Sequence, residues 1–141
     1  QDYIGRRPAQ RTHAAAAVAL QLSMTGFDAP PSRWMDEARK HFIETDQGLD
    51  ITYDPALRTA FLAAMAAPPV DLWPLFMAAA QKPLALIRGA NSDLLTQATA
   101  DEMAERAPTM IHAEVPGRGH VPFLDEPEAL SAIHRFLGQL L

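Results

Sequence analysis

Hydrophobic and polar positions along the chain follow two patterns, and the change between them falls near Gln81. Before Gln81, apolar residues recur at helical spacing or lie in alanine-rich runs bounded by proline, glycine and capping residues. These patterns predict a helix at residues 12–24 capped by Thr12, a helix at 32–42 capped by Ser32, and a helix at 54–66. They also predict a short helix from 71 and a short extended segment at 48–53. Alanine buries little apolar area, so these helices are expected to need a partner surface.

After Gln81 the apolar residues gather in short runs. Residues 83–89 and 110–115 are typical of strands buried on both faces. A capping box at residues 99–102 predicts a helix to 106, and an apolar stripe predicts a final helix at 128–140. Strand, helix, strand and helix in succession indicate an α/β fold with a parallel sheet. Two strands leave unpaired edges, so we expect a piece of a larger sheet rather than an isolated monomer.

Composition narrows the classes of function. The chain has 141 residues, enough for one domain, with 48% hydrophobic and 21% charged residues, as in globular proteins. Its formal charge is −5 and its longest basic run is a pair of arginines, which argues against nucleic-acid binding. No apolar stretch approaches the roughly 20 residues that cross a bilayer. Cysteine is absent, so disulfides and thiolate metal sites are excluded. We expect a cytoplasmic protein without a metal or a cofactor.

Two loops carry the candidate chemistry, because each follows a predicted strand at its carboxyl end. The first is residues 89–95, with Asp93, and the second is residues 116–122, with His120. Ligands of open α/β sheets bind at this edge, and we expect the Asp93 carboxylate to lie within hydrogen-bonding reach of the His120 imidazole. In a catalytic triad the acid accepts the Nδ1 proton of the histidine, and the histidine takes the proton of the nucleophile.

These loops resemble a known family. Gly-Ala-Asn-Ser-Asp-Leu-Leu after one strand and Pro-Gly-Arg-Gly-His-Val-Pro after the next are similar to the last two strand-loop units of α/β-hydrolases. The following Asp-Glu-Pro and the amphipathic closing helix fit the same family. The resemblance implies that Asp93 is the triad acid and His120 the triad base. It also implies that residues 81–141 are the C-terminal part of a parallel α/β-hydrolase sheet and residues 1–80 a helical lid.

The nucleophile of that family lies in Gly-x-Ser-x-Gly. None of the serines of the chain has glycines at that spacing: Ser23, Ser32, Ser92 and Ser131. We therefore expect no acyl transfer by this chain alone. The expected partners are a small carbonyl substrate and either a missing N-terminal half or a second copy of the chain.

Three functions stay open at this point. The leading one is hydrolysis of esters, lactones or related carbonyl substrates. A second is a dehalogenase or epoxide hydrolase with an aspartate nucleophile, and a third is a non-catalytic fragment that acts as a binding or assembly module. In the third case, Asp93 caps the following segment and His120 is a surface histidine.

Other side chains also have two interpretations. Ser92 is expected to form a turn rather than to act as a nucleophile. Arg118 either orients a substrate carboxylate or is an exposed arginine. Four side chains either line an acyl pocket or pack in a core: Trp34, Trp73, Phe76 and Met77.

Overall fold

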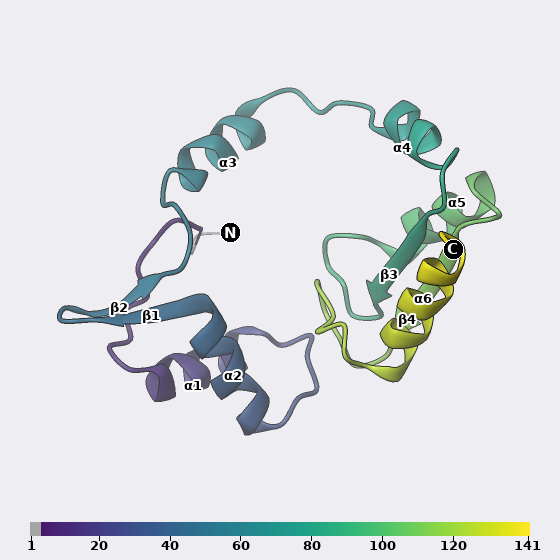
Figure 1. Cartoon of the computed structure of the whole chain (residues 1–141). Coiled ribbons are helices and arrows are strands. Elements are labelled where there is room, and N and C mark those ends of the chain that lie inside the picture. Colours follow the sequence, from purple (N-terminus) through teal and green to yellow (C-terminus); the bar gives the residue numbers. More distant parts are fainter. Residues whose placement is uncertain (1–3) are drawn as a thin grey trace. The chain divides into compact units, whose positions relative to one another are not determined.

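The computed structural model describes residues 4–141 and divides the chain into two compact units (Figure 1). Unit 1 comprises the residues up to Thr25 together with Ala29–Val70, and unit 2 comprises Gly26–Asp28 and Asp71–Leu141. The first three residues of the expected 1–80 region lie outside the described residues. Each unit is described by itself.

Unit 1 is built from three helices and a hairpin. Helix α1 (His13–Ser23) packs against α2 (Pro31–His41), which leads directly into strand β1 (Phe42–Thr45). Strand β2 (Gly48–Ile51) pairs antiparallel with β1, and helix α3 (Leu57–Ala66) follows. The buried apolar side chains of this unit are Ala16, Ala17, Trp34, Ala38, Leu49 and Ile51.

The local signals in unit 1 were partly right. Thr12 caps α1 as predicted, since its Oγ1 accepts a hydrogen bond from the Ala15 N–H at 3.3 Å. The prediction that Ser32 caps α2 is wrong, because the helix begins at Pro31 after an extended Pro30. Proline suits the first helical position, because an N–H there would make no hydrogen bond within the helix. Strand β1 was not predicted.

Unit 2 carries the predicted strand-helix-strand-helix succession. Helix α4 (Trp73–Ala79) precedes strand β3 (Ala85–Gly89), helix α5 (Gln97–Arg106), strand β4 (Ile111–Val115) and helix α6 (Pro127–Gly138). Strands β3 and β4 pair in parallel, from Ala85 opposite Ile111 to Gly89 opposite Val115. Helix α6 packs against both strands. The buried apolar side chains are Ala100, Ala107, Ile111, Val115, Ala129 and Ala132.

Helix α5 begins earlier than predicted. Its N-cap is Thr96, which has an extended backbone and whose Oγ1 accepts from the Thr99 N–H at 3.1 Å. The predicted capping box, with Thr99 as the cap, is therefore wrong. Thr99 has the glutamate three residues later that a capping box requires, but Thr96, which ends the preceding loop, caps the helix.

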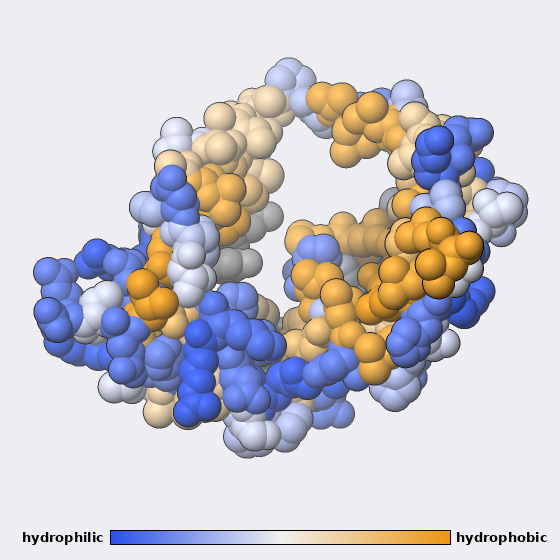
Figure 2. All heavy atoms as spheres, viewed as in Figure 1, coloured by the Kyte–Doolittle hydropathy of each residue, from blue (hydrophilic) through white to orange (hydrophobic). Residues whose placement is uncertain are grey.

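Large apolar side chains remain exposed on unit 2. On α6, Leu130, Leu137 and the following Leu140 are exposed, and Figure 2 shows hydrophobic residues in orange over this helix. Strands β3 and β4 form a sheet of only two strands. No helix among residues 4–141 is long and apolar enough to cross a membrane. Unit 2 thus has apolar surface that its own described residues leave uncovered.

Val115 tests the core of unit 2, because it is the largest fully buried side chain among residues 4–141. Replacing Val115 by alanine leaves a cavity in this core, and we expect a loss of about 2 kcal/mol in the free energy of unfolding. The same change at Val70, which is 72% exposed, is the matched control. Urea denaturation of both variants measures the difference. Equal effects of the two substitutions would contradict the assignment of the core.

Candidate functional site

The loop with Asp93 is a tight turn that leaves the end of β3. The Ser92 N–H donates to the Gly89 carbonyl at 2.9 Å, and the Leu95 N–H donates to the Ser92 Oγ at 3.1 Å. The prediction that Ser92 forms a turn is confirmed. Asp93 lies within this turn and is exposed. The turn therefore presents the carboxylate at the carboxyl end of β3.

Arg88 closes the base of this loop. It is 5% exposed, and it donates from Nε to the Leu95 carbonyl at 2.8 Å and from Nη1 to Gln97 Oε1 at 2.9 Å. The same Nη1 lies 2.9 Å from Oε2 of Glu114, its register partner on β4. The sequence prediction missed this group. The sequence did contain a signal for this ion pair. Each of the two apolar strands carries one charged residue, and the two residues, Arg88 and Glu114, pair in register.

The loop with His120 leaves β4 through Gly117, whose φ of +65° favours glycine. Gly119 is buried and His120 is exposed. Between the glycines, Arg118 is mostly buried and its Nε lies 2.7 Å from Oε1 of Glu126. The expectation that Arg118 is exposed is therefore wrong, since its guanidinium is engaged within the loop. The alternative, that Arg118 orients a substrate carboxylate, stays a prediction.

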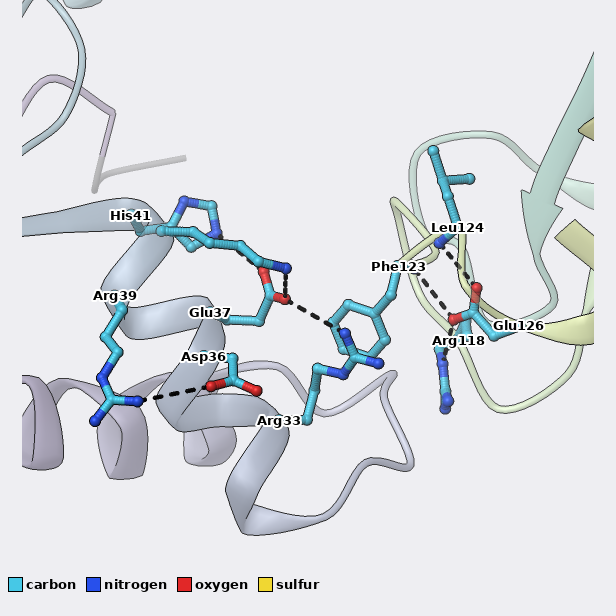
Figure 3. A network of polar contacts seen from close by, with 10 residues as sticks. Arg33, Asp36, Glu37, Arg39, His41, Arg118, Phe123, Leu124 and Glu126 are labelled. Carbon is cyan, nitrogen blue, oxygen red and sulfur yellow. Dashed lines mark hydrogen bonds and ion pairs between the residues drawn. The ribbon is translucent and has the colours of Figure 1, made fainter. Parts of the chain in front are cut away.

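Glu126 organises the rest of this loop (Figure 3). Its Oε1 accepts from the Phe123 N–H at 3.1 Å and its Oε2 from the Leu124 N–H at 2.9 Å. Leu124 has a φ of +68°, an unfavourable conformation for leucine that these bonds support. Burial raises the pKa of Glu126, but hydrogen bonds from Arg118 and from main-chain N–H groups outweigh it and hold the pKa below its ordinary value.

The two loops touch through their main chains. The Ala90 N–H donates to the Val115 carbonyl at 2.9 Å, and the Asn91 N–H donates to the Arg118 carbonyl at 2.8 Å. A Cβ on Gly89 would lie 2.8 Å from the Arg118 carbonyl carbon and closer still to the oxygen of Gly119. Only glycine fits there without displacing the second loop.

The structure brings the loops of Asp93 and His120 together without joining the two side chains. Both side chains are exposed, and no hydrogen bond or ion pair connects them within residues 4–141. Catalytic hydrogen bonds are often long in unliganded enzymes and tighten in the complex. The pairing of Asp93 with His120 stays a prediction.

Other candidate residues were also placed. Trp34 is buried in unit 1, where it packs in the core. Trp73 stacks edge-on with Phe76 at 5.6 Å between ring centroids, and the Arg106 guanidinium lies 4.0 Å over its ring. In the part of the chain that the structure describes, no group of three His, Asp or Glu side chains is arranged to hold a metal ion.

The parallel strand pair, with its carboxylate loop, its histidine loop and its C-terminal helix, agrees with the C-terminal part of an α/β-hydrolase sheet. A solved α/β-hydrolase from Novosphingobium aromaticivorans matches 98% of the chain, with a TM-score of 0.86 and 37% sequence identity. The E-2-(acetamidomethylene)succinate hydrolase matches 94% with a TM-score of 0.72, and at 22% identity it supports the fold alone. The chain therefore has the C-terminal part of the α/β-hydrolase fold.

One curated relative extends the comparison. The 3-hydroxybutyrate-oligomer hydrolase of Cupriavidus necator is 31% identical over 144 residues, which cover 95% of the chain. No protein-family model matches. The chain spans about half the length of its relatives, 48% of the Cupriavidus protein and 50% of the Novosphingobium structure.

Gly89 provides a test of the contact between the loops. Replacing Gly89 by alanine forces a Cβ into the main chain of the second loop, and we expect a loss of about 1–3 kcal/mol or more in the free energy of unfolding. Gly138 is the matched control, because a Cβ there meets nothing within 4 Å. Alanine at Gly138 should change stability by about 1 kcal/mol at most, in the stabilising direction. Thermal and urea unfolding measure both variants, and an equal response would show that the loops do not touch as described.

Glu126 provides a test at variable pH. Its folded-state pKa is lowered, so its carboxylate stabilises the fold above its ordinary pKa of 4.5, and this stability is lost as the pH falls through the folded-state pKa. At pH 7, Glu126→Gln should cost about 1.5–3 kcal/mol, the range for hydrogen bonds to charged groups. The difference from the wild type should shrink in acid. Glu105→Gln, on an exposed side chain, is the control. A deficit that is the same at pH 3 and pH 7 would rule out a role for the charge.

Proposed function

We propose that the chain is the lid and C-terminal half of a hydrolase that cleaves carboxylic esters. Asp93 serves as the acid and His120 as the general base. The nucleophile comes from polypeptide outside these 141 residues, because none of their serines lies in Gly-x-Ser-x-Gly. Residues 1–80 would form the lid over the substrate.

One observation carries this proposal. The loops with Asp93 and His120 leave neighbouring parallel strands at the same end and are joined there by main-chain hydrogen bonds. That edge of an open α/β sheet is where ligands bind. Both side chains are exposed at this edge, so a nucleophile from a further strand could reach the imidazole.

The proposed roles of His120 and Asp93 follow from the chemistry of the imidazole and of the carboxylate. His120 would take the proton of the nucleophile as it attacks the ester carbonyl, and would return it to the departing alcohol. Asp93 would accept the Nδ1 proton of His120, fix the tautomer and stabilise the imidazolium. In the second half-reaction, His120 would activate the water that releases the acid.

The relative from Cupriavidus necator supports the choice of ester. It is named for 3-hydroxybutyrate oligomers, whose units are joined by ester bonds. Short esters of hydroxy acids are therefore the first substrates to test.

The proposed partner is the polypeptide that would complete the two-stranded sheet of unit 2. Strands β3 and β4 form a sheet of two, and two leucines of α6, Leu130 and Leu137, are exposed. Parallel sheets are normally covered on both faces and continue over several strands. We propose that an N-terminal half, in the same or a separate polypeptide, completes the sheet. A second copy of the chain is the alternative partner.

The experiment uses the complete protein, in which this chain is joined to the segment that supplies the nucleophile. Asp93→Asn and His120→Ala should each lower kcat for p-nitrophenyl butyrate and for a hydroxybutyrate dimer by about a thousandfold or more. The matched controls are Asp101→Asn and His134→Ala, which change exposed residues on α5 and α6. Steady-state kinetics measure all four variants.

Two outcomes would contradict the proposal. Full activity of the His120→Ala protein would remove the general base. Inactivity of the complete protein on every ester, with turnover of haloalkanes or epoxides instead, would favour an aspartate nucleophile. The 141-residue chain alone should show no ester cleavage above that of its His120→Ala variant.

A further inference from the structure

Three residues from the first part of the sequence belong to unit 2. Gly26–Asp28 lie between α1 and α2 in the chain but form one compact unit with residues 71–141. The Asp28 N–H donates to the Gly117 carbonyl at 2.9 Å, and the Arg118 Nη1 donates to the Asp28 carbonyl. The segment is therefore fastened to the loop that carries His120.

The same segment is also fastened to the loop that carries Asp93. Nδ2 of Asn91 donates to the Gly26 carbonyl at 3.0 Å. A Cβ on Gly26 would lie 3.3 Å from the Gly119 Cα and 3.5 Å from the Asn91 Cβ. Gly26 thus lies at the point where the two loops meet, and it contacts both.

Phe27 lies against the residue that precedes His120. A Cβ on Gly119 would lie 2.8 Å from Cε2 of Phe27, so the ring occupies the space where a side chain of residue 119 would be. The ring also packs on Phe123, with 5.3 Å between centroids and 44° between planes. Phe123 donates its N–H to Glu126. The histidine loop is thereby held by its contact with Phe27 and by the hydrogen bonds of Glu126.

We propose that Gly26–Asp28 is a positioning element of the catalytic pair, which sets the distance and orientation between the Asp93 loop and the His120 loop. This inference rests on the proposed function. Asn91 is two residues from Asp93, and Gly119 is adjacent to His120. Both side chains of the pair are exposed and unbonded to each other, so their alignment depends on how the main chain of each loop is held.

The contacts predict which kinetic constant responds. A loss of alignment of about 1 Å between catalytic groups can lower the rate by about a hundredfold. Substrate affinity need not change, because none of these contacts is made to substrate. A variant that loosens the segment should therefore lower kcat while KM stays close to its original value.

The test uses the complete protein and two local variants. Asn91→Ala removes the bond to Gly26 but leaves the Asn91 N–H free to donate to Arg118. Phe27→Ala removes the ring beside Gly119. Each should lower kcat for p-nitrophenyl butyrate by about ten- to a hundredfold, with KM within about threefold. The controls are Gln139→Ala, an exposed amide, and Phe136→Ala, a half-buried ring on α6.

A double variant tests whether the Phe27 ring affects kcat through its direct contact with residue 119. Gly119→Ala places a methyl group against the Phe27 ring and should lower kcat. Combining it with Phe27→Ala makes room for that methyl, so the double variant should be more active than Gly119→Ala alone. Thermal melts of every variant show whether it folds, and Phe27→Leu replaces Phe27→Ala if the latter does not.

The outcomes separate the inference from the proposed function. Unchanged kcat in Asn91→Ala and Phe27→Ala, with activity lost in Asp93→Asn and His120→Ala, would overturn the positioning role alone. A fall in kcat that Phe136→Ala matches at equal loss of melting temperature would also overturn it. If Asp93→Asn and His120→Ala keep full activity, the proposed function is wrong and the positioning role falls with it.

Discussion

The site depends on the close approach of two main chains at the carboxyl ends of β3 and β4. Gly89 lies so near the carbonyl groups of Arg118 and Gly119 that a side chain at its position would push the second loop away. The missing side chain lets the Asn91 N–H reach the Arg118 carbonyl and extends the pairing beyond the strands. The main chains of the two loops are therefore fixed relative to each other. This restricts where the side chains of Asp93 and His120 can lie.

Two ion pairs, each with one buried member, support this contact: Arg88 is buried in the first and Glu126 in the second. Arg88 pairs with Glu114 under the first loop, and Arg118 pairs with Glu126 within the second. Removing charges from water is costly, and it is tolerated only where hydrogen bonds satisfy the remaining polar atoms. Here the arginines also donate to main-chain carbonyls, and Glu126 also accepts main-chain N–H groups. The pairs thus fix loop conformation and leave the edge of the sheet open for chemistry.

Local patterns predicted the parts of the fold that local physics decides. The two parallel strands, the final amphipathic helix and the Thr12 cap were predicted because short apolar runs, helical periodicity and capping side chains act over a few residues. Strand β1 was missed because it continues α2 without a break and is defined by its pairing with β2. The attachment of Gly26–Asp28 to unit 2 was missed because its partners lie more than sixty positions away, as the Asn91 bond to Gly26 shows. Asp93 and His120 were identifiable as candidates from their loops, but no sequence pattern reports how the side chains are oriented.

The pairing of Asp93 with His120 in the complete protein is the central claim, and nitrogen-15 NMR of labelled histidine tests it most directly. The account predicts that neutral His120 carries its proton on Nδ1, where a carboxylate can accept it. It also predicts that Asp93→Asn removes this preference while the signals of His134 stay unchanged. Two results would contradict the account: neutral His120 that carries its proton on Nε2, or His120 signals that do not change in the Asp93→Asn protein.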